Sequence, residues 1–168
     1  MNRPIEQCYW VVPGRLLAGE YPRNKDEESS PEKIGALLRA GVTTFIDLTE
    51  ENELHPYSSL LGTAASHRRF PVRDRSVPES LEITAAVLDA IDHGIESDER
   101  VYVHCWGGVG RTGVIVGCWL ARHGSPGEAA LAHLRELWQQ CPKSCRRRSP
   151  DTQEQERYVL RWTEGGQP

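Results

Sequence analysis

Short apolar runs rich in β-branched residues alternate along the chain with apolar positions at helical spacing. The clearest strand candidate is Val42–Leu48, and shorter runs lie at residues 9–12, 15–19, 67–72 and 101–103. A Pro-Gly pair at positions 13–14 separates the first two runs. Because this dipeptide favours a tight turn, these two runs are predicted to form a hairpin.

Apolar residues three and four positions apart predict the helices. Ser29 and Glu32 fit a capping box at the start of the first helix, and Gly41 is a natural stop. The same spacing predicts further helices at Ser80–Ile95, 114–120, 125–138 and 151–162, with a short one inside 56–65.

Helices that separate short strands indicate an α/β fold. We predict a central, mostly parallel sheet of about four or five strands with helices on both faces. The 168 residues, with 38% hydrophobic and 26% charged residues, suit one globular domain over 1–168, with a core at about 8–163 and short polar tails.

Charge and hydropathy exclude several classes of partner. Twenty basic and 24 acidic residues give a net charge of −4, so we expect no nucleic-acid partner. No apolar run reaches the length of about 18 residues that a membrane helix needs, and residues 1–6 lack the apolar segment of a signal peptide. Five cysteines, an odd number, favour a reducing, cytoplasmic setting with one working thiol.

Candidate chemistry is concentrated in residues 101–113, where a strand, a glycine-rich turn and a helix start follow one another. Such a turn points successive backbone N–H groups at one place, and the helix dipole adds positive potential there. Arg111 can hold two phosphate oxygens with its planar fork. These features would stabilise a thiolate at Cys105, placed to attack phosphorus.

The segment His104–Gly113 closely resembles the His-Cys-X5-Arg-Thr-Gly signature of cysteine-dependent protein tyrosine phosphatases. The length is similar to that of the small dual-specificity phosphatase-like members, and residues 9–22 resemble bacterial members in particular. The resemblance implies a single-domain protein tyrosine phosphatase-like fold and an enzyme that needs no cofactor and no metal.

The resemblance also implies a role for each residue of the signature. Cys105 would form a phosphocysteine intermediate, and Arg111 would hold the phosphate oxygens in the transition state. Thr112 would hydrogen-bond the Cys105 sulfur, and His104 would orient the loop backbone. The backbone between Cys105 and Arg111 would bind the phosphate through Trp106, Gly107, Gly108, Val109 and Gly110.

A general acid is also needed to protonate the leaving oxygen. Asp74 follows a predicted strand and lies 31 residues before Cys105, where the resemblance leads us to expect the acid. The Trp-Pro-Asp motif of the family is absent here. The arginine neighbours of Asp74 favour the ionised form, which suits a base better than an acid. The stretch 149–155 resembles the segment that positions the attacking water, with Gln155 as the candidate.

The implied partner is a phosphorylated protein or peptide, with phosphotyrosine first and phosphoserine or phosphothreonine as further candidates. Alternatives are a phosphoinositide or RNA 5′ phosphate, sulfur transfer or arsenate reduction, and phosphopeptide binding without turnover. No lysine lies inside the loop, which argues against lipid. Open questions are the oligomeric state, and whether Asp47, Glu50 or the basic residues Lys143 and Arg146–Arg148 take part.

Overall fold

The protein folds around a five-stranded sheet, seen in a computed structural model that describes residues 2–23 and 30–164. The outermost pair is antiparallel and all other neighbours are parallel, which confirms the predicted hairpin and mostly parallel sheet. The strands, in their order across the sheet, are β1 (Cys8–Val12), β2 (Leu16–Gly19), β5 (Val101–His104), β3 (Thr44–Asp47) and β4 (Ser66–Arg69).

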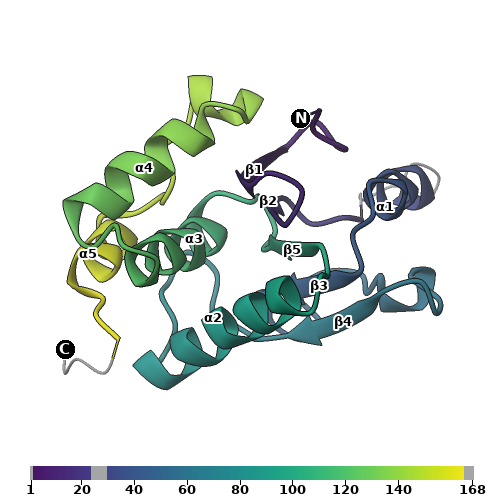
Figure 1. The fold of residues 1–168 in the computed structure, drawn as a ribbon, viewed down its shortest axis with the longest axis horizontal. Coiled ribbons are helices and arrows are strands. Elements are labelled where there is room, and N and C mark those ends of the chain that lie inside the picture. Colours follow the sequence, from purple (N-terminus) through teal and green to yellow (C-terminus); the bar gives the residue numbers. More distant parts are fainter. Residues whose placement is uncertain (1, 24–29, 165–168) are drawn as a thin grey trace.

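Helices cover both faces of the sheet, as predicted. Figure 1 shows α1 on the opposite side of the sheet from α3, α4 and α5. The helices are α1 (Ser30–Arg39), α2 (Leu81–Glu96), α3 (Gly110–Arg122), α4 (Glu128–Trp138) and α5 (Gln153–Arg161), with 3₁₀ turns at Ser58–Leu60 and Pro142–Cys145.

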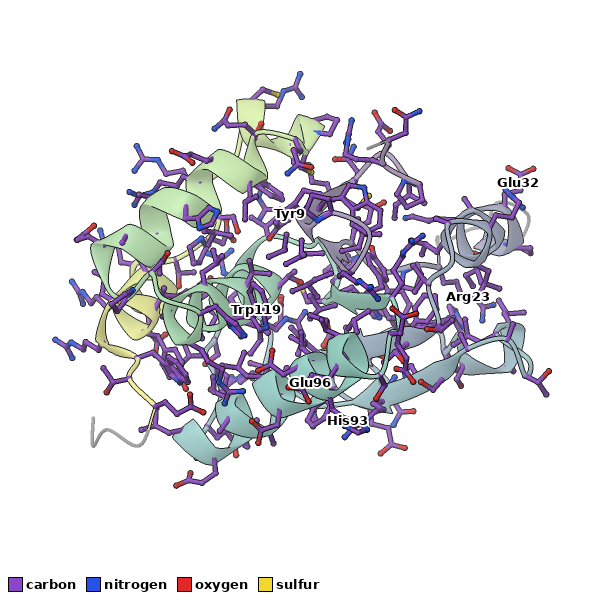
Figure 2. All side chains as sticks on the ribbon, viewed as in Figure 1. Tyr9, Arg23, Glu32, His93, Glu96 and Trp119 are labelled. Carbon is purple, nitrogen blue, oxygen red and sulfur yellow. The ribbon has the colours of Figure 1, made fainter. Side chains whose placement is uncertain are left out.

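Alternation along the strands divides the core into two layers. Val101 and Val103 of β5 face α2 and α3, whereas Tyr102 between them belongs to the cluster beneath α1. Tyr9 of β1 packs edge-on against Trp138 of α4, with ring centroids 5.4 Å apart, and Figure 2 shows it inside the molecule. Both faces of the central strands are therefore buried, as parallel sheets require.

Three predicted boundaries differ from the structure. The strand predicted at 67–72 ends at Arg69, and the helix predicted inside 56–65 is only a 3₁₀ turn. The helix predicted at 114–120 begins earlier, at Gly110. The hydrophobic periodicity does not predict this first turn, because residues 110–113 are Gly-Arg-Thr-Gly and present no apolar face.

Helices α2 and α4 differ in how their first turns are capped. The helix predicted to begin at Ser125 begins instead at Glu128, as α4. Its N-cap residue is Gly127, which has a positive φ of 63° and provides no side-chain cap. Ser80, in contrast, caps α2, since its side chain accepts a hydrogen bond from Ile83 N. The cap predicted at Ser29 lies outside the described residues.

The topology places one loop at the centre of the molecule. β5 lies between β2 and β3, and residues 105–109 connect its carboxyl end to α3. In parallel sheets this end of the central strands is where ligands bind. Among the described residues, no helix is both long and apolar enough to span a bilayer.

Candidate active site

The loop between β5 and α3 presents a row of unused backbone donors. Within the described residues, none of the backbone amides from 106 to 112 donates a hydrogen bond to a protein acceptor; the first such bond is from Gly113 N to Val109 O, at 3.3 Å. These amides lie at the amino end of α3, where the helix dipole favours an anion. The structure thus leaves these amide donors available at the position where the sequence predicts an anion-binding loop.

A cavity of about 380 Å³ opens in front of this loop. It is lined by Cys105, which is only 3% exposed, and by the loop residues Trp106, Gly107, Val109 and Gly110. A buried thiol at the base of a cavity is accessible only to a group that enters the cavity.

Gly108 differs from the other predicted phosphate-binding residues because it does not line the cavity. Its φ is +72°, and a Cβ built there would lie 2.4 Å from the carbonyl carbon of Gly19. Gly108 thus allows the loop to pass closely over the end of β2, a position that only glycine fits.

Arg111 is held at the cavity by acceptors from two loops, one after β3 and one after β4. Its Nη2 donates to Oε1 of Glu53 at 2.6 Å, and its Nη1 donates to Oε2 of the same carboxylate at 2.8 Å. Nη1 also donates to the carbonyls of Val72 at 3.0 Å and Leu48 at 3.4 Å. The side chain is 1% exposed, so the guanidinium has one fixed orientation before any substrate arrives.

Glu53 is a site residue that the sequence did not single out. It lies in the charged loop after β3, and its two oxygens form a bidentate pair with Arg111. Burial alone would raise the pKa of the Glu53 carboxyl, but the hydrogen bonds from Arg111 hold it below its usual value. Glu53 is therefore ionised at neutral pH and acts by positioning Arg111.

Asp74 reaches the same guanidinium from the loop between β4 and α2. Its Oδ1 lies 2.9 Å from Nη2 of Arg111, and its side chain is 51% exposed. Asp74 and Cys105 line one cavity, as the sequence predicted for an acid and a nucleophile. The exposure gives the carboxyl room to move when a substrate enters.

His104 supports the loop from below. Its Nδ1 lies 3.2 Å from the carbonyl oxygen of Cys105, which can only accept, and its Nε2 lies 2.6 Å from the hydroxyl of Tyr57. Burial lowers the pKa of His104 to about 4, so the ring is neutral. A neutral ring that donates from Nδ1 must accept at Nε2 from Tyr57.

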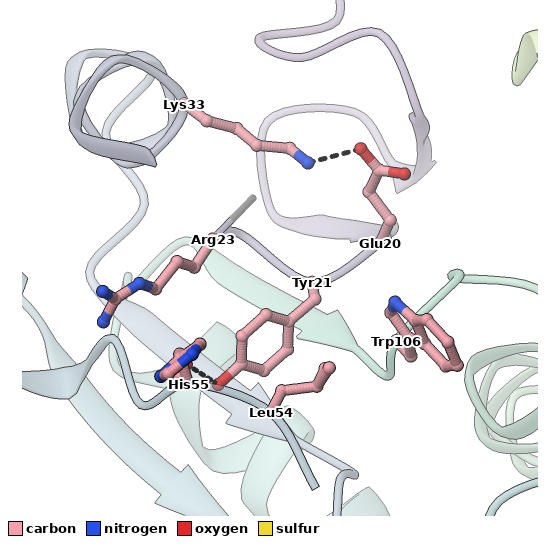
Figure 3. Close-up of a pocket in the computed structure, with 7 residues that line it drawn as sticks. All are labelled: Glu20, Tyr21, Arg23, Lys33, Leu54, His55 and Trp106. Carbon is pink, nitrogen blue, oxygen red and sulfur yellow. Dashed lines mark hydrogen bonds and ion pairs between the residues drawn. The ribbon is translucent and has the colours of Figure 1, made fainter. Parts of the chain in front are cut away.

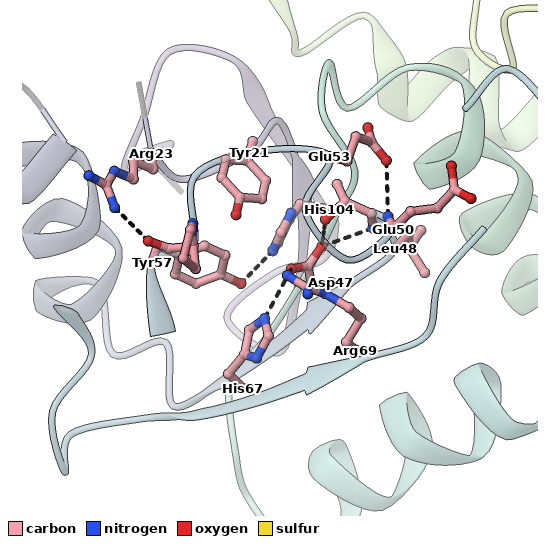
Figure 4. A network of polar contacts seen from close by, with 12 residues as sticks. Tyr21, Arg23, Asp47, Leu48, Glu50, Glu53, Tyr57, His67, Arg69 and His104 are labelled. Atoms are coloured by element: carbon pink, nitrogen blue, oxygen red, sulfur yellow. Dashed lines mark hydrogen bonds and ion pairs between the residues drawn. The ribbon is translucent and has the colours of Figure 1, made fainter. Parts of the chain in front are cut away.

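A buried carboxylate, Asp47, lies beside this histidine at the carboxyl end of β3 (Figure 4). It accepts hydrogen bonds from Thr49 N at 2.9 Å and Arg69 Nη2 at 3.0 Å, and pairs with His67 Nε2 at 3.0 Å. Burial would raise the pKa of Asp47, but these partners hold it well below its usual value. Asp47 is thus part of the supporting network and does not line the cavity.

Two predicted residues lie near the loop without facing the cavity. Gln155 is fully buried, and its side chain accepts from the amides of Asp151 and Thr152 and donates to Ser76 O at 2.9 Å. It therefore ties α5 to the loop that carries the acid. Thr112 is fully buried too, and its Oγ1 has no hydrogen-bond partner among the described residues.

Comparison with known proteins gives the family of this site. Residues 5–159 match the family model described as "Swiss Army Knife protein, DSP-PTPase phosphatase domain". The chain belongs to this family. It is thus a phosphatase domain of the cysteine-dependent superfamily that the signature predicted, and it is expected to be an enzyme.

Relatives and solved structures agree with this assignment. The phosphatase domain is 32% identical over 122 residues to the putative tyrosine phosphatase 067L of Invertebrate iridescent virus 3, covering 70% of this chain but only 47% of the viral protein. Two solved folds are similar at lower identity. Tk-PTP in its active form has a TM-score of 0.74 at 21% identity, covering 91% of this chain and 93% of that one. PTPMT1 in complex with PI(5)P has a TM-score of 0.69 at 16% identity, covering 92% of each chain.

The phosphatase domain has a second hollow of about 170 Å³ on the other side of Trp106 (Figure 3). Tyr21, Arg23 and Lys33 are among its lining residues, and Lys33 forms an ion pair with Glu20. Trp106 is 50% exposed and lines both hollows. The two hollows therefore adjoin, with the indole as their common wall.

Neutral His104 makes the stability of the phosphatase domain depend on pH. Between its ordinary pKa of 6.5 and its folded pKa of about 4, the unfolded chain binds a proton that the folded chain does not. Stability therefore falls as the pH falls through this window, by about 2 kcal/mol from His104 alone between about pH 7 and about pH 5. Urea denaturation at both pH values measures the loss.

The matched control for this titration is His104→Asn, which removes the ionisable ring. We expect the loss of stability between the two pH values to be about 2 kcal/mol smaller in the variant than in the wild type. An equal loss in both proteins would contradict a buried, neutral His104.

Proposed function

We propose that this domain is a protein phosphatase that hydrolyses phosphotyrosine, with phosphoserine and phosphothreonine as further substrates, through a phosphocysteine intermediate. The observation that carries the proposal is the row of unused amides from 106 to 112 in front of Cys105. Together with the fixed fork of Arg111, these donors can stabilise the charge of a phosphoryl group during its transfer. The Cys105 sulfur then attacks phosphorus, and the bond from phosphorus to the leaving oxygen breaks.

Asp74 supplies the proton that the leaving oxygen needs. Its carboxylate is paired with Arg111, with Oδ1 2.9 Å from Nη2. A phosphoryl dianion bound at Arg111 would compete for this cation and place its own negative charge near Asp74. Release from Arg111 would free the Asp74 carboxyl to turn toward the leaving oxygen. After transfer, Asp74 is ionised and can accept a proton from the attacking water.

Thr112 fits a role in the second step, in which water breaks the bond between sulfur and phosphorus. A buried hydroxyl without a hydrogen-bond partner destabilises the fold by about 1–3 kcal/mol. We therefore expect the Thr112 hydroxyl to have a function at this position. We assign Thr112 Oγ1 as a donor to the departing sulfur of Cys105, as the family resemblance implied.

Protein is favoured over lipid as the substrate for two reasons. The exposed large hydrophobic side chains in the described residues are only Leu60 and Trp106, which do not form the apolar surface that a membrane-docking enzyme needs. The anion-binding loop also contains no lysine. The fold alone does not decide, since one structural neighbour was solved with PI(5)P.

A phosphate-release assay on three substrates tests the proposal. With a chelator present, the wild type should release phosphate from a phosphotyrosine peptide faster than from a phosphoserine peptide or from vesicles that contain a phosphoinositide. A requirement for an added divalent metal, or preferred hydrolysis of the lipid, would contradict it.

Replacing Asp74 with asparagine should lower kcat on a phosphotyrosine peptide by about 10²-fold or more, because the leaving oxygen then departs unprotonated. The loss should be smaller for an aryl phosphate whose leaving group is already a stable anion. Steady-state kinetics on both substrates measures the difference. Asp98→Asn is the matched control: Asp98 is exposed and has a positive φ that asparagine tolerates, and activity should not change. An equal loss on both substrates would place the acid elsewhere.

A further inference from the structure

Two arginines that the catalytic steps do not use line the cavity of Cys105. Arg75 follows the acid in the loop between β4 and α2, and Arg147 precedes α5. They approach the cavity from two separate segments of the chain, in addition to Arg111 on the loop itself.

Arg75 is held in an unusual backbone conformation. Its φ is +60°, a left-handed region that costs free energy for any residue with a side chain. The residue is exposed, and no hydrogen bond or ion pair connects it to the rest of the described chain. Strain of this kind is typical of functional sites, and here it puts an unneutralised guanidinium at the cavity.

Arg147 is oriented by its neighbours, one of which is its counter-ion Asp151. Its Nη2 pairs with Asp151 at 2.8 Å, and its carbonyl accepts from Trp138 Nε1 at 2.8 Å. Its Nη1 lies 3.7 Å from a Cβ built on Gly107, next to the anion-binding loop. A guanidinium has five N–H donors, so one edge stays available after Asp151 is bound.

Three arginines and two aspartates line the cavity, and Glu53 pairs with Arg111 from outside the lining. Asp74 pairs with Arg111 and Asp151 pairs with Arg147, while Arg75 has no counter-ion. When the substrate's phosphoryl group is bound by Arg111 and the loop amides, it does not reach Arg75 or the open edge of Arg147. These two groups therefore stay available for a second anion.

The geometry points to a second anion subsite, formed by Arg75 and Arg147, that binds an acidic side chain next to the phosphorylated residue of a protein substrate. This inference rests on the proposed function and adds a sequence preference to it. An extended peptide with its phosphoryl group at Cys105 must cross the cavity rim, where an Asp or Glu carboxylate can pair with either fork. The lack of an apolar surface favours a peptide over a lipid as the source of this anion.

The test uses three phosphotyrosine peptides that differ only in the flanking residues: glutamate, glutamine or lysine. We expect the wild type to prefer the glutamate peptide over the glutamine peptide by about two- to fivefold in kcat/KM, the upper part of the range for an exposed ion pair. High salt should reduce this ratio, because exposed charges are screened. In Arg75→Asn, whose new residue tolerates a positive φ, the ratio should fall toward one, because only the open edge of Arg147 remains.

Arg148→Asn is the matched control, because Arg148 is exposed in the same basic run but does not line the cavity. It changes the net charge equally, and the ratio should keep its wild-type value. Equal kcat/KM for all three peptides in the wild type would overturn the subsite but leave the proposed function standing. Failure to hydrolyse any peptide would overturn the proposed function itself. Arg75-dependent hydrolysis of a phosphoinositide in vesicles, faster than of any peptide, would overturn the assignment to protein.

Discussion

Cys105→Ser should abolish turnover of a phosphotyrosine peptide, with a loss on the order of 10⁴-fold or more. A serine hydroxyl is not ionised at neutral pH, so it cannot replace a thiolate as the nucleophile. The variant should still bind phosphate, because the amides of residues 106–112 and the fork of Arg111 do not depend on sulfur. Phosphate release measures the first effect and titration calorimetry with inorganic phosphate the second.

The matched control is Cys145→Ser, which makes the same change at an exposed free cysteine in the turn after α4. Its activity should equal that of the wild type. Comparable phosphate release by Cys105→Ser and the wild type would show that the cavity thiol is not the nucleophile.

Arg111→Lys should lower kcat by about 10²–10³-fold, although it keeps the positive charge. A lysine is a single point of charge and cannot copy the planar fork that Glu53 and the carbonyl of Val72 hold in place. Because the fork matches the transition state best, the loss should fall mainly on kcat and less on KM. Steady-state kinetics on a phosphotyrosine peptide separates the two.

Arg148→Lys serves as the matched control for Arg111→Lys, since Arg148 is exposed and lies outside the cavity. It should change neither constant. Arg111→Lys leaves the Glu53 carboxylate without its bidentate partner, which could destabilise the protein. A thermal melt of the variant checks that it is still folded. A folded Arg111→Lys protein with wild-type kcat would contradict a role for the fork in the transition state.

The catalytic loop could be predicted because its chemistry is contiguous. Residues 104–113 carry the candidate nucleophile, the amide donors and the arginine in one strand-turn-helix unit, so local geometry determines how they meet. Asp74 could be predicted for a different reason. The resemblance placed an acid on a loop after a strand, and the structure brings that loop to Arg111.

The support of the loop could not be predicted, because it comes from distant segments. Glu53 reaches Arg111 across 58 positions, and Tyr57 reaches His104 across 47. Only the packing of the loops after β3 against β5 and α3 brings these side chains together. A charged loop after a central strand was visible in the sequence, but nothing local distinguished Glu53 from Glu50.

The same limit applies to two of the expected site residues. The spacing of Gln155 suggested a place near the attacking water, whereas its amide caps α5 and holds the loop of Asp74 through Ser76. The predicted role of Gly108 in phosphate binding stays a prediction, but its close approach to the end of β2 is a second constraint that the spacing did not show. Both roles depend on neighbours that sequence spacing does not show.

The central claim is that a phosphoryl group passes through Cys105, and trapping this intermediate tests it most directly. Asp74→Asn should accumulate the intermediate from an aryl phosphate whose leaving group is already a stable anion, because the first step then needs no proton while the base that activates water is gone. The variant would be mixed with a phosphorylated substrate, quenched in acid within its turnover time, digested and mapped by mass spectrometry. We expect one phosphoryl group on the peptide that contains Cys105, and none after Cys105→Ser is added to the same variant. A phosphoryl group on another residue, or turnover with no protein-bound phosphoryl group at any time, would contradict the mechanism.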